Sequence, residues 1–107
     1  MLVYKVLRAG EWAELEARGE SLGAPVDRAD GYVHFSTAGQ LAGTLAKHFA
    51  GETGLALLAV EVEQAGSAIR WEPSRGGALF AHLYRALSLA DVVWARPLAE
   101  VSLETLE

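Results

Sequence analysis

One short stretch, Gly31–Thr37, reads GYVHFST and combines a predicted strand with polar side chains at its end. Alternation along a strand sends Tyr32, His34 and Ser36 to one face and the apolar residues between them to the other. A histidine and a hydroxyl therefore leave the same face just before a helix begins, where exposed amides and the helix dipole favour an anionic or carbonyl ligand. The alternative is structural: the hydroxyls only cap the helix, and His34 is a satisfied, half-buried side chain.

The helix after this stretch is predicted over residues 38–49. Thr37 and Gln40 form a capping-box pattern, in which each side chain accepts a hydrogen bond from the other residue's backbone amide. One face of the helix carries Leu41, Thr44, Leu45 and His48. His48 is therefore expected to be a packed histidine on an apolar face.

Further from the stretch, the pattern predicts mostly strands. The expected strands are Leu2–Leu7, Gly31–Phe35, Leu55–Val62 (central), Ile69–Glu72, Leu79–Tyr84 and Val92–Arg96. Glu11–Arg18 is expected to be a helix, Gly19–Asp30 a surface loop and Leu87–Asp91 one helical turn. A doubly wound α/β fold would need more helices in the second half of the chain. The predicted class is α+β, with small mixed or antiparallel sheets and two main helices.

The composition limits the classes of partner. The 107 residues are 51% hydrophobic, which suits a single domain over residues 1–107. No apolar run approaches the roughly 20 residues that span a bilayer, and no signal-peptide pattern is present, so a cytoplasmic protein with no membrane partner is expected. The chain has no cysteine, which excludes disulfides and thiolate metal ligands. A net charge of −5 disfavours bulk nucleic-acid binding but allows a small anion held by a local arginine.

A second candidate segment runs from Trp71 to Tyr84. Glu72 can act as a base or stabilise a developing positive charge, and Arg75 can clamp a phosphate or carboxylate. Trp71 or Tyr84 can stack on a ring, and His82 adds an imidazole nearby. The structural alternative places Trp71 in the core, pairs Glu72 with Arg75 at the surface, and assigns Gly76-Gly77 to a turn.

Other site classes receive less support from the residues. The three histidines are 14 and 34 positions apart and match no local metal motif, so no metal ligands are assigned. A metal-dependent hydrolase using His34, Glu72 and His82 is the less favoured alternative. The glycine patterns of dinucleotide-binding and phosphate-binding loops are absent, as is the serine-hydrolase motif.

The chain as a whole resembles the small bacterial family known as domain of unknown function 952. The likeness covers nearly the whole chain, and each matching piece is short. The matching residues are Tyr4-Lys5-Val6, Trp12, Asp30–Thr37, Gln40, Thr44, Phe49, Trp71-Glu72, Phe80, His82-Leu83-Tyr84 and Leu87.

The resemblance implies a compact form of the ADP-ribosyltransferase fold, in which two small sheets flank a cleft that binds NAD in the active relatives. By position, Lys5 takes the place of a nucleotide-contacting residue, and His34, Ser36 and Thr37 shape the pocket. The implied activity is an NAD- or ADP-ribose-using enzyme with NAD as substrate, in which Glu72 stabilises an oxocarbenium-like state. Under this reading His34 holds the ribose or phosphate, His82 completes the cleft, and Tyr32 or Tyr84 stacks on nicotinamide.

Two alternatives remain open from the sequence. One is a non-catalytic module that binds a small anion or a nucleotide in the same cleft. The other is a small stability or interaction domain whose polar side chains only hydrogen-bond one another. The residues do not predict the oligomeric state.

Overall fold

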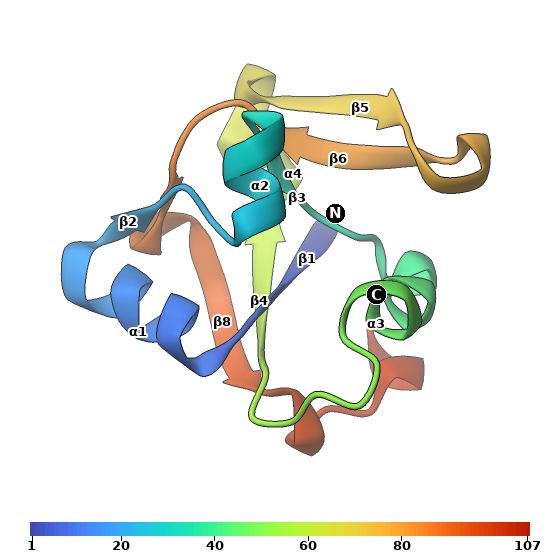
Figure 1. Cartoon of the computed structure of the whole chain (residues 1–107). Coiled ribbons are helices and arrows are strands. Elements are labelled where there is room, and N and C mark those ends of the chain that lie inside the picture. The colour runs from blue at the N-terminus through green and yellow to red at the C-terminus, as the bar shows by residue number, and fades with distance from the viewer.

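The first of three sheets forms the centre of the molecule. The structure, a computed structural model, describes residues 1–107. This sheet contains β1 (Leu2–Leu7), β4 (Ala56–Glu61) and β8 (Val92–Pro97) in the order β1-β4-β8 (Figure 1). The predicted central position of the strand around residues 56–61 is confirmed, because β4 is hydrogen-bonded on both sides.

The second sheet is built by segments distant in sequence. It contains β3 (Val33–His34), β6 (Leu79–Leu83) and β5 (Ile69–Pro73) in the order β3-β6-β5. A two-stranded ribbon pairs β2 (Glu20–Ser21) with β7 (Leu87–Ser88). All strand pairs are antiparallel, so the predicted α+β class is confirmed with antiparallel rather than mixed sheets.

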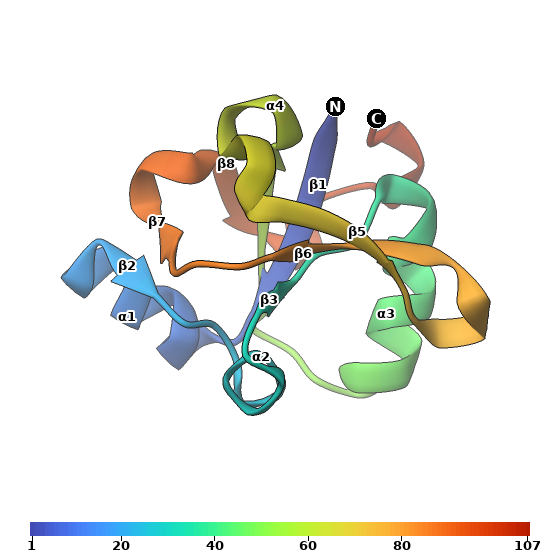
Figure 2. The same ribbon diagram turned by 90° about the horizontal axis from the view of Figure 1, so that it is seen from above.

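The helices lie at the sides of the first sheet. α1 (Ala9–Arg18) and α3 (Leu41–His48) lie on opposite sides of β1 in both views (Figure 1, Figure 2). Two shorter helices are α2 (Pro25–Asp30) and α4 (Val62–Ala65). Single 3-10 turns occur at Ala38–Gln40, Gly66–Ala68, Arg75–Gly77, Leu89–Asp91, Leu98–Glu100 and Leu103–Thr105.

The core consists of two apolar clusters on opposite faces of the first sheet. One includes Val3 and Leu7 of β1 and packs against the buried face of the second sheet. The other includes Tyr4 and Val6 and packs against α3 and the C-terminal segment. Alternation along β1 therefore places Lys5 in the same row as Val3 and Leu7, facing the interior between the two sheets.

The predicted surface loop Gly19–Asp30 is wrong, because it contains β2 and α2. Proline at the first position of α2 loses no intrahelical hydrogen bond. Asp27 accepts a hydrogen bond from the amide of Ala24 at 2.7 Å, and Gly31 ends the helix with a φ of 85°. A helix of six residues is too short to show an apolar period, so the sequence pattern missed it.

Several predicted boundaries also shift. The strand Gly31–Phe35 shortens to β3, and the helix over residues 38–49 begins with a 3-10 turn before α3. Leu87–Asp91 is a helical turn only from Leu89, because its first two residues pair with β2. The expected helix Glu11–Arg18 begins two residues earlier, at Ala9.

Candidate functional site

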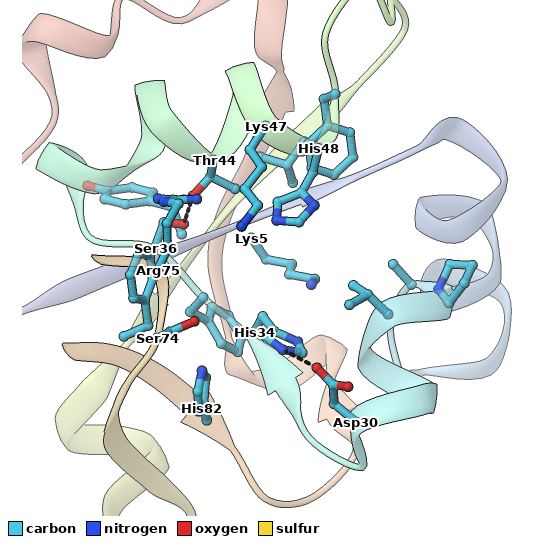
Figure 3. A pocket seen from close by; sticks show the side chains of 18 of the residues that line it. Lys5, Asp30, His34, Ser36, Thr44, Lys47, His48, Ser74, Arg75 and His82 are labelled. Carbon is cyan, nitrogen blue, oxygen red and sulfur yellow. Dashed lines mark hydrogen bonds and ion pairs between the residues drawn. The ribbon is translucent and has the colours of Figure 1, made fainter. Parts of the chain in front are cut away.

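A cavity of about 510 Å³ opens where β1 and β3 meet. Its walls come from β1, α2, β3, α3, β6 and the turn between β5 and β6 (Figure 3). Backbone hydrogen bonds of 2.7 and 2.9 Å between Tyr4 and Ser36 join the two sheets at this point. The cavity is therefore fixed by the junction of the sheets rather than by a loop.

A buried carboxylate, Asp27, organises the α2 side of the cavity. Its side chain is fully buried and lies 2.7 Å from the Nζ of Lys5, which is itself 7% exposed. The carboxylate also accepts hydrogen bonds from the amide of Ala24 (2.7 Å) and the amide of His34 (2.9 Å), and lies 2.7 Å from His34 Nδ1. Burial alone would raise the pKa of Asp27, but the bonds from His34 and the charge of Lys5 hold that pKa below its usual value.

The imidazole of His34 lies between two carboxylates. Its Nδ1 contacts Asp27, and its Nε2 lies 2.9 Å from Asp30 Oδ2 (Figure 3). These two contacts tie β3 to the middle and to the last residue of α2. His34 thus lines the cavity with both ring nitrogens already engaged.

His82 stands directly opposite His34 in the pairing of β3 with β6, and the two rings are 5.1 Å apart. Its Nδ1 lies 2.8 Å from Glu72 Oε1, and the Tyr84 hydroxyl donates to the same oxygen at 2.7 Å. The bonds from Tyr84 and then from His82 lower the pKa of Glu72. The ionised carboxylate therefore orients His82, which lines the cavity while Glu72 lies behind it.

The expected ring-stacking residues lie outside the cavity lining. Tyr32 packs against His82, His34 and Tyr84 at centroid distances of 4.2, 4.7 and 5.1 Å. Trp71, at 36% exposure, follows β5 to the opposite face of the second sheet from Glu72. Among the predicted site residues, the lining includes Lys5, His34, Ser36, Arg75 and His82, and does not include Tyr32, Thr37, Trp71, Glu72 or Tyr84.

Thr37 has a local structural role. Its amide donates to Gln40 Oε1 at 3.0 Å, as the capping-box pattern predicts. The Gln40 amide group also donates to the carbonyl of Leu79 at 2.8 Å, which ties this turn to β6.

The α3 side of the cavity is cationic. The Arg75 guanidinium lies 4.8 Å above the Phe80 ring and donates to Thr44 Oγ1 at 3.3 Å, and that hydroxyl lies 2.7 Å from Ser36 Oγ. Arg75 therefore does not form the surface pair with Glu72 that the sequence left open. Lys47 extends from α3 beside it (Figure 3). Neither Arg75 nor Lys47 has a carboxylate within ion-pair distance.

His48 lines this side of the cavity and is exposed, so the expected packed histidine is wrong. The helix ends at His48, and the apolar contacts come from Leu41 and Leu45. Burial lowers the pKa of His48, and the neighbouring charges of Lys47 and Arg75 lower it further. Lys47 and Arg75 therefore act on His48 as well as on the cavity.

Two functional neighbours were missed from the sequence. Asp27 lies in the segment that is expected to be a surface loop, and no sequence motif singles out Lys47. Lys5 was a signal that such an acid exists. It lies in an apolar strand, and a lysine is almost never buried without a partner.

No helix of the structure is long and apolar enough to cross a membrane. No group of three or more His, Cys, Asp or Glu side chains is arranged to hold a metal ion.

Comparisons with known proteins agree on the family and the fold. The family model described as "Protein of unknown function (DUF952)" matches residues 6–95. The crystal structure of protein CC0527 from Caulobacter crescentus is 45% identical over 91% of this chain and 85% of that one, with a TM-score of 0.87. The solution NMR structure of CC0527 is 46% identical over 90% and 83% of the two chains, with a TM-score of 0.80. No curated protein matches the chain.

Proposed function

The chain belongs to the DUF952 family, and we propose from the charge of its cavity that it binds a small phosphate-bearing ligand of nucleotide size. The observation that carries the proposal is the wall formed by Arg75 and Lys47. Both cations lack a carboxylate partner although the chain has a net charge of −5. Positive charge concentrated in a concave site attracts anions even when the whole protein is acidic.

Phosphate suits this wall for geometric reasons. A guanidinium presents parallel donors that match two phosphate oxygens, and Lys47 adds a point charge. The hydroxyls of Ser36 and Thr44 lie next to Arg75 and bond each other, and Thr44 accepts from the guanidinium and so helps to position it at the cavity wall. The other lysine and arginine of the cavity lining are each paired with an acid: Lys5 with Asp27, and Arg8 with Glu52 at 2.8 Å.

The size of the cavity favours a nucleotide over a bare ion. Small-molecule sites commonly enclose roughly 300–1,000 Å³, and this cavity has about 510 Å³. The resemblance to compact ADP-ribosyltransferases suggests NAD or ADP-ribose as the first ligands to try, in a cytoplasmic setting.

Ligand-dependent melting tests the proposal. NAD, ADP-ribose and AMP at millimolar concentration are expected to raise Tm, since a ligand that binds only the folded state stabilises it. Arg75→Ala and Lys47→Ala should each remove most of that shift, while Arg18→Ala, which makes the same charge change on α1, should not. Equal losses in all three variants would show that binding follows net charge rather than the cavity.

Cleavage of NAD is a second candidate function. The paired imidazoles of His34 and His82, 5.1 Å apart in the cavity, favour it. Glu72 would then act through His82, because its Oε1 is bonded to Nδ1 of that ring rather than facing the cavity. Release of nicotinamide by the wild-type protein, lost in Glu72→Gln, would support cleavage; a Tm shift without release would leave a binding module.

A further inference from the structure

The structure leaves one buried side-chain polar atom without a hydrogen-bond partner, the Nε2 of His82. His82 is 2% exposed and lines the cavity (Figure 3). Nearly all buried polar groups in proteins are hydrogen-bonded, because an unmade bond leaves the desolvation of the group uncompensated. An unpaired nitrogen at a cavity wall is therefore placed for a partner that comes from outside the chain.

The other ring nitrogen decides what kind of partner fits. Nδ1 faces Glu72, whose carboxylate also accepts from Tyr84. An ionised carboxylate only accepts hydrogen bonds, so Nδ1 carries a proton, and in the neutral imidazole Nε2 then carries the lone pair. The unpartnered Nε2 of this cavity-lining residue is therefore an acceptor in the neutral ring.

The ring is also held in place. Tyr32 covers one side at a centroid distance of 4.2 Å, and His34 meets it edge-on at 5.1 Å. Because Glu72 fixes the remaining rotation through Nδ1, Nε2 keeps one direction. A fixed acceptor discriminates between ligands better than a mobile one.

Phe80 on β6 connects His82 to the cationic wall formed by Arg75 and Lys47. Arg75 is stacked over Phe80, and Phe80 is two residues before His82 on the same face of β6. Two residues of a strand span roughly 7 Å. That length separates the backbones of Phe80 and His82, so a ligand that reaches both Arg75 and His82 carries a hydrogen-bond donor apart from its anionic group.

We propose that His82 accepts a hydrogen bond from a sugar hydroxyl of the ligand whose phosphate is held by Arg75 and Lys47. This rests on the proposed phosphate site and narrows the ligand class to phosphorylated sugars, free or within a nucleotide. His82 is then the residue that selects the sugar, and Glu72 is a positioning residue that acts through it.

Two phosphate monoesters test the assignment by calorimetry. Ribose 5-phosphate carries hydroxyls and methyl phosphate carries none. His82→Phe should weaken binding of ribose 5-phosphate roughly tenfold, as expected for one lost hydrogen bond, and leave methyl phosphate unchanged. Trp71→Phe, on the other face of the same sheet, is the matched control and should change neither affinity.

Two further variants guard against a folding defect in His82→Phe. His82→Gln places a carbonyl oxygen near the position of Nε2 and should retain the preference for ribose 5-phosphate. His82→Asn restores a donor near Nδ1 but no acceptor at Nε2, and should lose the preference. Circular dichroism of each variant reports whether it is folded.

The outcomes separate the two proposals. Equal losses for both ligands, or no change for either in the folded variants, would overturn the role of His82. If Arg75→Ala weakens both ligands while the wild type does not prefer ribose 5-phosphate, the phosphate site stands and the sugar assignment fails. If the wild type binds neither ligand at millimolar concentration, both proposals fail.

Discussion

At the scale of single residues, the α2 side of the cavity depends on the partners of one carboxylate. Asp27 lies fully buried against Lys5, and the same side chain bonds His34. A buried ion pair adds little net stability when both partners are present, yet removing one partner leaves an uncompensated charge. The pair therefore acts mainly by fixing the position of His34.

Asp27→Asn is expected to lower the free energy of unfolding by about 3–5 kcal/mol, because Lys5 then stays buried without its counter-ion. Equilibrium unfolding in urea measures the loss. The control is Glu14→Gln, which breaks an exposed pair with Arg28 (3.1 Å) and should cost only about 0–1 kcal/mol. Similar losses in the two variants would contradict the structural role of Asp27.

The titration of Asp27 has a predictable sign. Its pKa in the folded protein lies below the ordinary value of 3.8, so the unfolded chain binds a proton first as the pH falls. Its stabilisation is complete above about pH 5 and is lost as the pH falls through the folded-state pKa. Urea unfolding between pH 6 and pH 3 should therefore show a smaller loss of stability in Asp27→Asn than in the wild type.

At the scale of elements, α2 shows how a short helix is held by its ends. Gly23 precedes it with a φ of 91°, and a side chain there would collide with the carboxylate of Asp27. Gly31 follows it with a φ of 85° but faces open space. Both glycines thus need a positive φ, but only at Gly23 is the space for a side chain already filled.

Gly23→Ala should consequently destabilise the protein more than Gly31→Ala. Gly31→Ala loses only the roughly 1–2 kcal/mol that a left-handed backbone costs a residue with a side chain. Gly23→Ala has the same backbone cost and also displaces Asp27 from Lys5. Thermal and urea unfolding of both variants provide the comparison. An equal effect would mean that Asp27 can move away without cost.

Prediction of elements succeeded where local periodicity was long enough. The strand Leu2–Leu7 is confirmed in full, and β4 carries an apolar run that indicated its central position. β2 and β7, which the pattern missed, have two residues each, and α2, which it also missed, has six. Such elements form because a partner strand or a buried side chain completes their hydrogen bonds, which no local pattern reveals.

At the scale of the whole molecule, the cavity is a junction between two sheets. β1 contributes Lys5, β3 contributes His34 and β6 contributes His82, so the candidate site is assembled from residues 5 to 82. α3 and the β5–β6 turn then add the cationic wall. The overall charge of −5 and the local positive field have opposite signs.

The salt dependence of phosphate binding distinguishes the effect of the positive cavity wall from the effect of the negative net charge. If the cavity wall dominates, raising the ionic strength from about 0.01 M to about 0.15 M should weaken AMP binding several-fold, because screening removes an attraction. If the net charge dominated, the same change would strengthen binding by screening a repulsion. Calorimetry at the two salt concentrations, with Arg75→Ala for comparison, decides between them.

The sequence by itself determined the α+β class, the central strand and the two segments that carry His34 and His82, because strand alternation and helix patterns are local. Only the tertiary structure decided which of these side chains are free. Asp27 and Asp30 occupy both nitrogens of His34, while Glu72 occupies one nitrogen of His82 and the other has no partner. Hydrogen-bond partners depend on which strands and helices meet, and antiparallel pairing brings together residues that are far apart in the chain.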